Sequence, residues 1–402
     1  MITPAEAEAL IRDRAPAMPV EIAPLAELTG AVLRERIVAS RDQPPFDRVT
    51  MDGIAFASAA AAAGRREFRI AGAQAAGARQ MVLASKDACF EAMTGAVLPQ
   101  GCDCVIPVER ISVEAGIARL ADDVAPVPGM NIHPRGMDCR AGAVLLEPGT
   151  TLGPPEVAVI ASTGLARAEI SRSPRIVVIS TGDELIEPGE AVADWQIYRS
   201  NAYGVLTALR RRGFTRLTHD HLPDDLEILR TRLRDLLDQN DVLVLSGGVS
   251  MGKFDFIPQV LTELGISLVF HRISQRPGKP MWFGVGPAGR AGRAVYALPG
   301  NPVSTLICLT RYVMPGLAAA MAAKPVAADV VALAGNFEVK PALTYFLPVR
   351  LAADDLGHIC AHPRPTQGSG DFTSLIGTDG LVELSPGPQV TPTGTVVPFY
   401  RW

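Results

Sequence analysis

The sequence has few cysteines, and they are spaced unlike metal ligands. Only 6 of the 402 residues are cysteine, and no two of them form a Cys-x-x-Cys pair. This pattern argues against a disulfide framework and against a zinc site. It is typical of a reduced cytoplasmic protein in which cysteines are small core residues, so we expect a cytoplasmic location.

The sequence also lacks a strong charge imbalance and a targeting segment. Charged residues make up 20% of the chain and the net charge is −4, which argues against general nucleic-acid binding. The amphipathic start, Met1 to Arg14, lacks the apolar core of a signal peptide. No apolar run approaching the roughly 18 residues of a membrane helix is evident, so no membrane partner is expected. The 48% of hydrophobic residues suffices for two to four globular domains.

The pattern of apolar residues changes along the chain. Residues 1 to about 40 have a helical pattern, which ends in a polar stretch rich in proline. Residues 46 to about 140 have short apolar runs cut by Gly and Pro, with a helix expected only at 57–63, and this predicts a β-rich module. A helical period returns at 154–164. The tail, about 325–402, predicts a small β domain.

Strands and helices alternate from Arg175 onward. Strands are expected at 176–179, 242–245, 266–273, 281–284 and 294–298. Helices are expected at 201–212, 224–240, 254–264 and 303–321, the first of them with Ser200 as its N-cap. Such alternation predicts a parallel sheet with right-handed crossovers. Ligands of such sheets bind at the carboxyl ends of the strands.

The most informative stretch is 241–255, where an apolar strand runs into a Gly-rich loop and then a helical pattern. This arrangement presents backbone N–H groups and a helix N-terminus to an anion. The spacing from Gly247 to Lys253 nearly makes a P-loop. However, Phe254 stands where a P-loop has the Ser or Thr that binds magnesium, and Asp255 follows as a possible metal ligand. The sequence therefore predicts a phosphorylated ligand that is not bound as in an ATPase.

Three further loops, 180–184, 276–279 and 299–304, combine glycine with polar or charged residues. Bare turns use the same residues, but four such loops, each after a predicted strand of one sheet, favour a binding site. Arg276 and Lys279, with Arg272 nearby, suit phosphate or another oxyanion.

Carboxylates share these loops with the cations. Asp183, Glu184, Asp224 and Asp255 would repel an anionic ligand unless a hard cation lay between them, so the mixture indicates Mg²⁺. Structural alternatives exist: Asp224 as a helix N-cap, Asp183 as a turn residue, and Asp255 as a favourable charge in the first turn of a helix. Glu184 has no such simple alternative.

Two other features favour structural roles. His219 and His221 lie two residues apart and would share a face of a strand, but no third metal ligand is near them. Cys102 and Cys104 are expected to be buried thiols.

Five motifs, in this order along the chain, resemble one known family. They are Thr50-Met-Asp-Gly53, Thr181-Gly-Asp-Glu-Leu185, Ser246-Gly-Gly-Val-Ser-Met-Gly252, Pro277-Gly-Lys-Pro280 and Leu298-Pro-Gly-Asn-Pro-Val-Ser304. Together they look like the MoeA family of molybdopterin molybdenumtransferases, and the E domain of gephyrin is similar. Each motif alone is weak, whereas five in the family's order are a strong signal that spans nearly the whole chain.

The resemblance implies an α/β multidomain protomer that forms an elongated homodimer. Its expected parts are a helical and β dimerisation part (1–45 and 140–172), an inserted β-rich module (46–139), a three-layer α/β molybdopterin-binding domain with a mostly parallel sheet (173–323) and a small C-terminal β-barrel (324–402). The implied substrates are adenylylated molybdopterin and molybdate. The implied reaction cuts the pyrophosphate bond, releases AMP and places molybdenum on the dithiolene sulfurs, assisted by Mg²⁺. Molybdopterin adenylyltransferase and molybdoenzyme acceptors are the possible partners.

The resemblance also implies the site residues. The implied catalytic acids are Asp52, Asp138, Glu184, Asp224 and Asp255, the last three also as metal ligands. The implied substrate-binding residues are Thr181, Gly182, Asp183, Ser246, Gly247, Gly248, Ser250, Arg276, Lys279, Pro280, Gly300, Asn301, Ser304, Arg350 and Ser369.

Three positions depart from the family pattern. Ile54 stands where an aromatic residue often follows Met-Asp-Gly, and Arg276 replaces a frequent Lys, but the acid and the positive charge remain. His133 stands where an Arg is frequent, which puts an anion contact there in doubt.

Two alternative functions remain. A scaffold or binding protein could keep the fold and bind the pterin without turnover, although such a binder gains nothing from carboxylates beside a phosphate. A molybdopterin adenylyltransferase would need the α/β domain alone, and the additional modules argue against it.

Overall fold

The computed structural model describes residues 1–248, 256–286 and 292–402. The chain divides into two compact units. We call the first the catalytic unit; it comprises Met1–Glu35, Pro148–Pro154 and Arg167–Trp402. We call the second the β-module unit; it comprises Arg36–Glu147 and Pro155–Ala166.

The β-module unit is built mainly of short strands, as the Gly- and Pro-interrupted apolar runs predict. Its largest sheet has six strands in the order β7-β4-β6-β5-β9-β8. In chain order they are β4 (Gly53–Phe56), β5 (Glu67–Gln74), β6 (Ala88–Ala92), β7 (Cys104–Pro107), β8 (Ile111–Glu114) and β9 (Ile117–Leu120). Phe56 and Phe68 stack with ring centroids 4.3 Å apart inside this unit. Burial of such aromatic pairs is a main stabilising term in a small sheet.

Smaller elements complete the β-module unit. Helix α2 spans Ser58–Ala62, within the Ala-rich stretch expected to be helical. The two-stranded pairs are β2 (Ile37–Val38) with β11 (Val144–Leu146), and β3 (Arg48–Val49) with β10 (Ile132–His133). Helix α3 spans Pro154–Ser162, two residues shorter than expected.

The expectation that residues 1–40 are helical throughout is wrong beyond the first helix. Helix α1 (Pro4–Arg14) has a capping box between Thr3 and Glu6 and ends at Ala15. Strand β1 (Val20–Pro24) follows and pairs antiparallel with β12 (Arg167–Ser171). Proline at positions 16, 19 and 24 prevents the helix from continuing, and the partner of β1 lies too far along the chain for a local pattern to reveal it.

The central sheet of the catalytic unit is mostly parallel, as predicted. Its six strands have the order β16-β13-β17-β21-β20-β18. They are β13 (Ile176–Thr181), β16 (Leu217–Leu222), β17 (Val242–Ser246), β18 (Ser267–His271), β20 (Trp282–Val285) and β21 (Ala294–Leu298). β16, β13, β17 and β21 are parallel, whereas β20 runs antiparallel to both of its neighbours.

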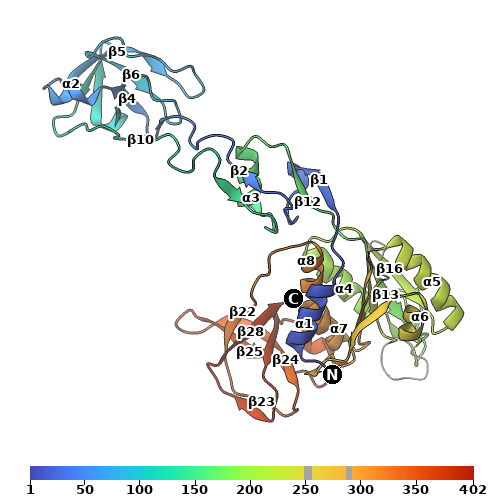
Figure 1. Ribbon diagram of the computed structural model, residues 1–402. Helices are drawn as coiled ribbons and strands as arrows, with labels where there is room; N and C mark the ends of the chain where they lie inside the picture. Colours follow the sequence, from blue (N-terminus) through green and yellow to red (C-terminus); the bar gives the residue numbers. More distant parts are fainter. Residues whose placement is uncertain (249–255, 287–291) are drawn as a thin grey trace. The chain divides into compact units, whose positions relative to one another are not determined.

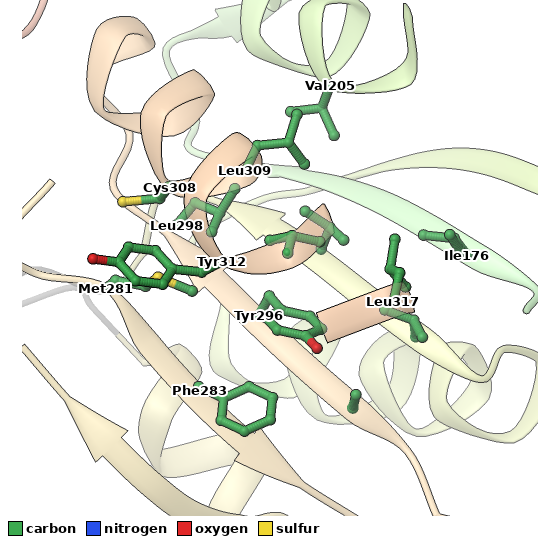
Figure 2. Close-up of a cluster of buried hydrophobic side chains, with 14 of the residues drawn as sticks. Ile176, Val205, Met281, Phe283, Tyr296, Leu298, Cys308, Leu309, Tyr312 and Leu317 are labelled. Carbon is green, nitrogen blue, oxygen red and sulfur yellow. The ribbon is translucent and has the colours of Figure 1, made fainter. Parts of the chain in front are cut away.

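Helices cover both faces of this sheet (Figure 1). Along β13, Ile176 and Val178 enter one core cluster, while Val177 and Ile179 enter the other. The first cluster also takes buried residues from α1, α4 (Ser200–Arg211), α7 (Pro302–Cys308) and α8 (Met314–Ala320); part of it is seen in Figure 2. The second core cluster takes buried residues from α5 (Leu226–Gln239) and α6 (Ile257–Glu263). Strand residues alternate between faces, so the domain has three layers, as expected.

Two helix starts differ from the expectation. Ser200 is the first residue of α4, and the N-cap is Arg199, which makes no side-chain capping bond. The chain reaches α4 directly from the short strand β15 (Ile197–Tyr198), which leaves no separate capping turn. The N-cap of α5 is Asp225, which accepts hydrogen bonds from the backbone N–H groups of Glu227 and Ile228. Asp224 is therefore not the helix cap.

The expected helix 303–321 spans Pro302–Ala320 and contains a π-helical turn at Leu309–Val313. Pro315 follows this turn closely and cannot donate a hydrogen bond to the carbonyl group four residues earlier. Contrary to the expectation, this one helix of the described residues is long and apolar enough to cross a membrane. Since its most apolar window is 72% buried inside the protein, we assign it as a core helix.

The C-terminal part forms a small closed β-barrel, as expected (Figure 1). Its strands are β22 (Asp329–Leu333), β24 (Thr344–Ala353), β25 (Ile359–Pro363), β26 (Gly380–Leu384) and β28 (Val396–Arg401). Pairing of β24 with both β25 and β26 closes the ring. β23 (Phe337–Val339) and β27 (Gln389–Thr391) form a separate antiparallel pair.

The buried carboxylate of Asp241 forms hydrogen bonds that link the starts of β13 and β17. Asp241, 4% exposed, precedes β17 and accepts hydrogen bonds from the backbone N–H of Arg175 (2.8 Å) and from Arg172 Nη1 (2.9 Å). Burial alone would raise the pKa of this carboxyl group, but the bonds from Arg172 and Arg175 outweigh it and hold the pKa well below its usual value. The ionised form is thus the stabilising one.

We expect Asp241→Asn to lower the free energy of unfolding at pH 7 by about 2 kcal/mol. Because the pKa is depressed in the folded state, this stabilisation is complete above the unfolded-state pKa of about 3.9 and is lost at lower pH. Urea unfolding of both proteins at a series of pH values should therefore show the difference shrinking as the solution is acidified. Asp123→Asn, which removes an exposed ion pair with Arg110, is the control with little effect. A difference that stays constant at acid pH would refute this role.

Candidate functional site

Three of the four predicted loops lie side by side at the carboxyl edge of the parallel sheet. Ser180 at the end of β13 is in register with Ser246 at the end of β17, and Ser246 is in register with Leu298 at the end of β21. The residues after these strands are Thr181 to Glu184, Gly247 and Gly248, and Pro299 to Asn301. The structure thus places them on neighbouring strands, as the rule for parallel sheets predicts.

The fourth loop follows β18, a strand of the central sheet, as expected. The sequence did not predict that Gln275 and Arg276 within this loop form β19, which pairs with β24 of the barrel. The antiparallel strands β18 and β20 flank it in sequence. The loop nevertheless packs on α7, where Cys308 Sγ lies 3.6 Å from the carbonyl oxygen of Gly278. The side chains of Arg276 and Lys279 are exposed.

The loops after β13, β17 and β21 lie against one another at their glycines. A Cβ atom at Gly247 would lie 2.7 Å from Thr181 Oγ1, and one at Gly300 would lie 3.5 Å from the Cα atom of Gly247. Gly247 and Gly248 both have positive φ, +102° and +67°. Consecutive residues of this kind can turn their N–H groups toward one anion. The hydroxyl of Thr181 is buried and has no hydrogen-bond partner among the described residues.

Asn201 at the start of α4 links two strand ends at the carboxyl edge of the sheet. Its Nδ2 donates to Ser246 Oγ (2.9 Å) and to the carbonyl oxygen of Gly300 (2.7 Å), so one side chain joins the ends of β17 and β21. The sequence pattern identified Asn201 only as a helix start. Nothing in the local sequence indicated its partners, which lie 45 and 99 residues further on.

The carboxylates lie around the loop after β13. Glu184 is exposed, and its carboxylate lies over Gly182, whose positive φ of +133° favours glycine. The backbone N–H of Asp224 donates to Asp183 Oδ1 (3.2 Å), which brings the second acidic loop to the first. Asp255 and Ser250, two further predicted site residues, lie outside the described residues. Within the described parts of the chain, no group of three or more His, Cys, Asp or Glu is arranged to hold a metal ion.

A barrel loop reaches the start of α7. Asn301 Nδ2 donates to Ser369 Oγ (2.8 Å), and the backbone N–H of Val303 donates to the Ser369 carbonyl oxygen (3.0 Å). Ser369 therefore satisfies a helix N-terminal donor and lies at the predicted site. Ser304 is buried in the first turn of the same helix. The exposed Arg350 lies on β24, in register with His362 of β25, and no contact among residues 1–248, 256–286 and 292–402 places it with these loops.

The remaining predicted acids, Asp52 and Asp138, belong to the β-module unit. Asp52 accepts hydrogen bonds from the backbone N–H (2.7 Å) and the hydroxyl (2.9 Å) of Thr94, and these bonds lower its pKa. Asp138 lies 2.8 Å from His133 Nε2, and Arg48 Nη2 approaches the other ring nitrogen at 3.3 Å. His133 thus pairs with an acid inside its own unit.

Structural roles fit the histidines and cysteines. His219 Nε2 lies 3.3 Å from Ser180 Oγ, and His221 Nε2 lies 2.9 Å from the Gly182 carbonyl oxygen, so both support the end of β13. All six cysteines are free thiols, and Cys102 and Cys104 are buried as predicted. Burial raises the pKa of these two to about 12, which keeps them unreactive near neutral pH.

Three family models match successive parts of the chain. The MoeA N-terminal region (domains I and II) matches residues 2–164, a probable molybdopterin-binding domain matches 177–319, and the MoeA C-terminal region (domain IV) matches 330–402.

Relatives and solved structures agree with these matches. A molybdopterin molybdenumtransferase from Synechocystis is 41% identical over 373 residues, which cover 93% of each chain. Another from Staphylococcus epidermidis is 26% identical over 93% of this chain and 89% of its own. A solved molybdopterin biosynthesis MoeA protein from Pyrococcus horikoshii superposes with a TM-score of 0.80 at 28% identity, covering 100% of this chain and 99% of that one. This chain belongs to the MoeA family of molybdopterin molybdenumtransferases.

Proposed function

We infer that this protein is a transferase of molybdenum cofactor biosynthesis that inserts molybdenum into molybdopterin. The observation that supports this most is the sheet edge where the Gly247–Gly248 backbone, the buried Thr181 hydroxyl and the carboxylate of Glu184 come from adjacent parallel strands. Backbone N–H groups suit phosphate, whereas carboxylates suit a cation. A phosphorylated substrate with a divalent cation uses both kinds of group.

We propose adenylylated molybdopterin and molybdate as the substrates and AMP as a product. The loops around Gly247, Gly248 and Gly300 bind the pyrophosphate, and Asn201 holds the loops after β17 and β21 in register. Breaking the pyrophosphate bond develops negative charge on its oxygens, and donors fixed before the reaction stabilise that charge without reorganising.

The residues present suit Mg²⁺. Hard oxygen donors are available from Glu184 and Asp224, which two adjacent loops present. The buried Thr181 hydroxyl adds an oxygen that has no hydrogen-bond partner in the described parts of the chain. Mg²⁺ is often held by only one or two carboxylates together with substrate phosphates. Bound there, Mg²⁺ would neutralise charge on the phosphate oxygens. Asp255 stays a predicted third ligand.

Arg276 and Lys279 are proposed to bind molybdate. Both side chains are exposed on the loop that packs against α7. A planar guanidinium beside an ammonium group suits a tetrahedral oxyanion. The contact between Gly278 and Cys308 fixes the backbone between the two cations.

We expect Lys279→Ala to raise the molybdate concentration that gives half-maximal activity by about tenfold, the effect of losing roughly 1.4 kcal/mol of charge-assisted bonding. The shift should shrink at high salt, because screening weakens the contribution of Lys279 in the wild-type protein. The measurement is a molybdate titration of cofactor formation at low and high ionic strength. Lys340→Ala, which removes the lysine after β23 whose side chain is 79% exposed, should leave the titration unchanged. An unaltered molybdate response in Lys279→Ala would show that the loop is only a turn.

We further propose a cytoplasmic homodimer that completes each site with Asp52 and Asp138 of the second chain. The six free cysteines suit a reducing compartment. Molybdopterin adenylyltransferase, as supplier, and molybdoenzymes, as acceptors, are the proposed partners. No nucleic-acid or membrane partner is proposed.

Reconstitution tests the function. Purified protein supplied with adenylylated molybdopterin, molybdate and Mg²⁺ should yield molybdenum that co-elutes with the pterin. The same mixture without the protein should yield little. If the pterin binds to the protein while the molybdenum stays free in solution, the result would instead favour a non-catalytic scaffold or binding protein.

A further inference from the structure

An exposed tryptophan lies on a loop that follows the proposed metal-binding residues in sequence. The loop, residues 187–196, connects β14 (Leu185–Ile186) to β15 (Ile197–Tyr198), and we call it the flap. Trp195 of the flap is 81% exposed. The other tryptophans are more enclosed: Trp282 is buried in the sheet and Trp402 is partly buried.

Hydrogen bonds at its base fix the flap to the proposed metal-binding loop. The backbone N–H of Ile197 donates to the carbonyl oxygen of Glu184 (2.9 Å). The backbone N–H of Arg199 donates to the carbonyl oxygen of Ile186 (3.0 Å). Trp195 is only two residues from Ile197, a reach of at most about 7 Å along the chain. The backbone of Trp195 therefore lies close to the loop that presents Glu184.

A polar network joins the start of the flap to α4. Glu187 forms an ion pair with Arg199 Nη2 (2.6 Å) and accepts a hydrogen bond from Tyr203 of α4. Within the flap, the backbone N–H of Ala193 donates to the side chain of Gln196 (3.1 Å).

Trp195 is not an isolated exposed apolar side chain on this segment. Val192, Ile197 and Tyr198 are also exposed. Exposed apolar side chains that gather on one segment, rather than standing singly, mark a binding surface.

We propose that Trp195 is the stacking platform for the pterin ring of the substrate, an inference that rests on the proposed function. Flat heterocycles gain binding energy on exposed aromatic faces. The substrate has two such rings, pterin and adenine. The flap exposes the carboxylates of Glu190 and Asp194, which only accept hydrogen bonds when ionised. The pterin edge offers adjacent N–H and NH₂ donors, whereas adenine offers a donor beside an acceptor, so the acidic flap suits the pterin.

Binding measurements on the full-length protein test this assignment. Trp195→Ala should weaken binding of adenylylated molybdopterin by about 5- to 100-fold, the range that loss of one base-stacking side chain produces. Trp195→Phe, which keeps an aromatic face, should lose much less. The affinity for AMP and the molybdate response should not change, because neither ligand contains the pterin. Intrinsic fluorescence should be quenched by the pterin substrate and not by AMP.

Leu356→Ala is the matched control, because Leu356 is also 81% exposed but lies in the turn between β24 and β25 of the barrel. Equal pterin affinity in Trp195→Ala and wild type would overturn the platform while leaving the proposed function intact. Loss of AMP binding in Trp195→Ala would assign the indole to adenine instead and would likewise overturn it. A wild-type protein that binds no adenylylated molybdopterin would overturn both.

Discussion

Glu184→Gln should abolish most molybdenum insertion while leaving the fold intact. The amide keeps the size of the side chain and removes the negative charge that we propose for Mg²⁺. Loss of groups one shell further from a metal costs about 10- to 100-fold in activity, so we expect a fall of about 100-fold or more here. The exposed position of Glu184 predicts little change in thermal stability.

Rates of insertion over a Mg²⁺ titration measure this effect. A ligand role predicts that Glu184→Gln needs more Mg²⁺ and that high Mg²⁺ partly restores its rate. Glu338→Gln, which changes a glutamate of β23 whose side chain is 63% exposed, should behave as wild type. Near-normal turnover of Glu184→Gln at low Mg²⁺ would rule out the metal role.

A mixture of two inactive variants should recover activity if each site draws on two chains. Asp52 belongs to the β-module unit and Glu184 to the catalytic unit. In a two-fold dimer with shared sites, a mixed dimer of Asp52→Asn and Glu184→Gln chains has one site with both lesions and one with neither. Random exchange makes half of the dimers mixed, so about one quarter of all sites should be intact.

The measurement is insertion activity before and after subunit exchange, with exchange verified by differently tagged chains. A variant carrying both substitutions, mixed with Glu184→Gln alone, is the control that should stay inactive, because no site in that mixture has a wild-type Glu184. If the Asp52→Asn and Glu184→Gln mixture stays inactive after verified exchange, the two residues act in the same chain.

The parallel part of the catalytic unit could be predicted because its signals are local. Ile176 to Ile179 and Val242 to Leu245 are continuous apolar runs, as strands buried on both faces require. Glycine at Gly247 and Gly248 marks turns that need positive φ. Such local features suffice to predict that three of the loops meet at one edge of the sheet.

The remaining features depend on contacts between distant residues. β19 is two residues long and pairs with β24, nearly seventy residues later, so nothing in the local sequence indicated this pairing. β1 depends on β12 in the same way. Asn201 acquires its role only when the ends of β17 and β21 are already adjacent. Local periodicity cannot report such partners.

Release of AMP is the measurement that tests the central claim most directly. The protein is incubated with adenylylated molybdopterin and Mg²⁺, with and without molybdate, and AMP is followed over time. A molybdenum-inserting transferase should release AMP in proportion to the molybdenum bound to the pterin, and omission of molybdate should slow that release. Tight binding of the pterin with no AMP released under any of these conditions would contradict the account and identify a binding protein on the same fold.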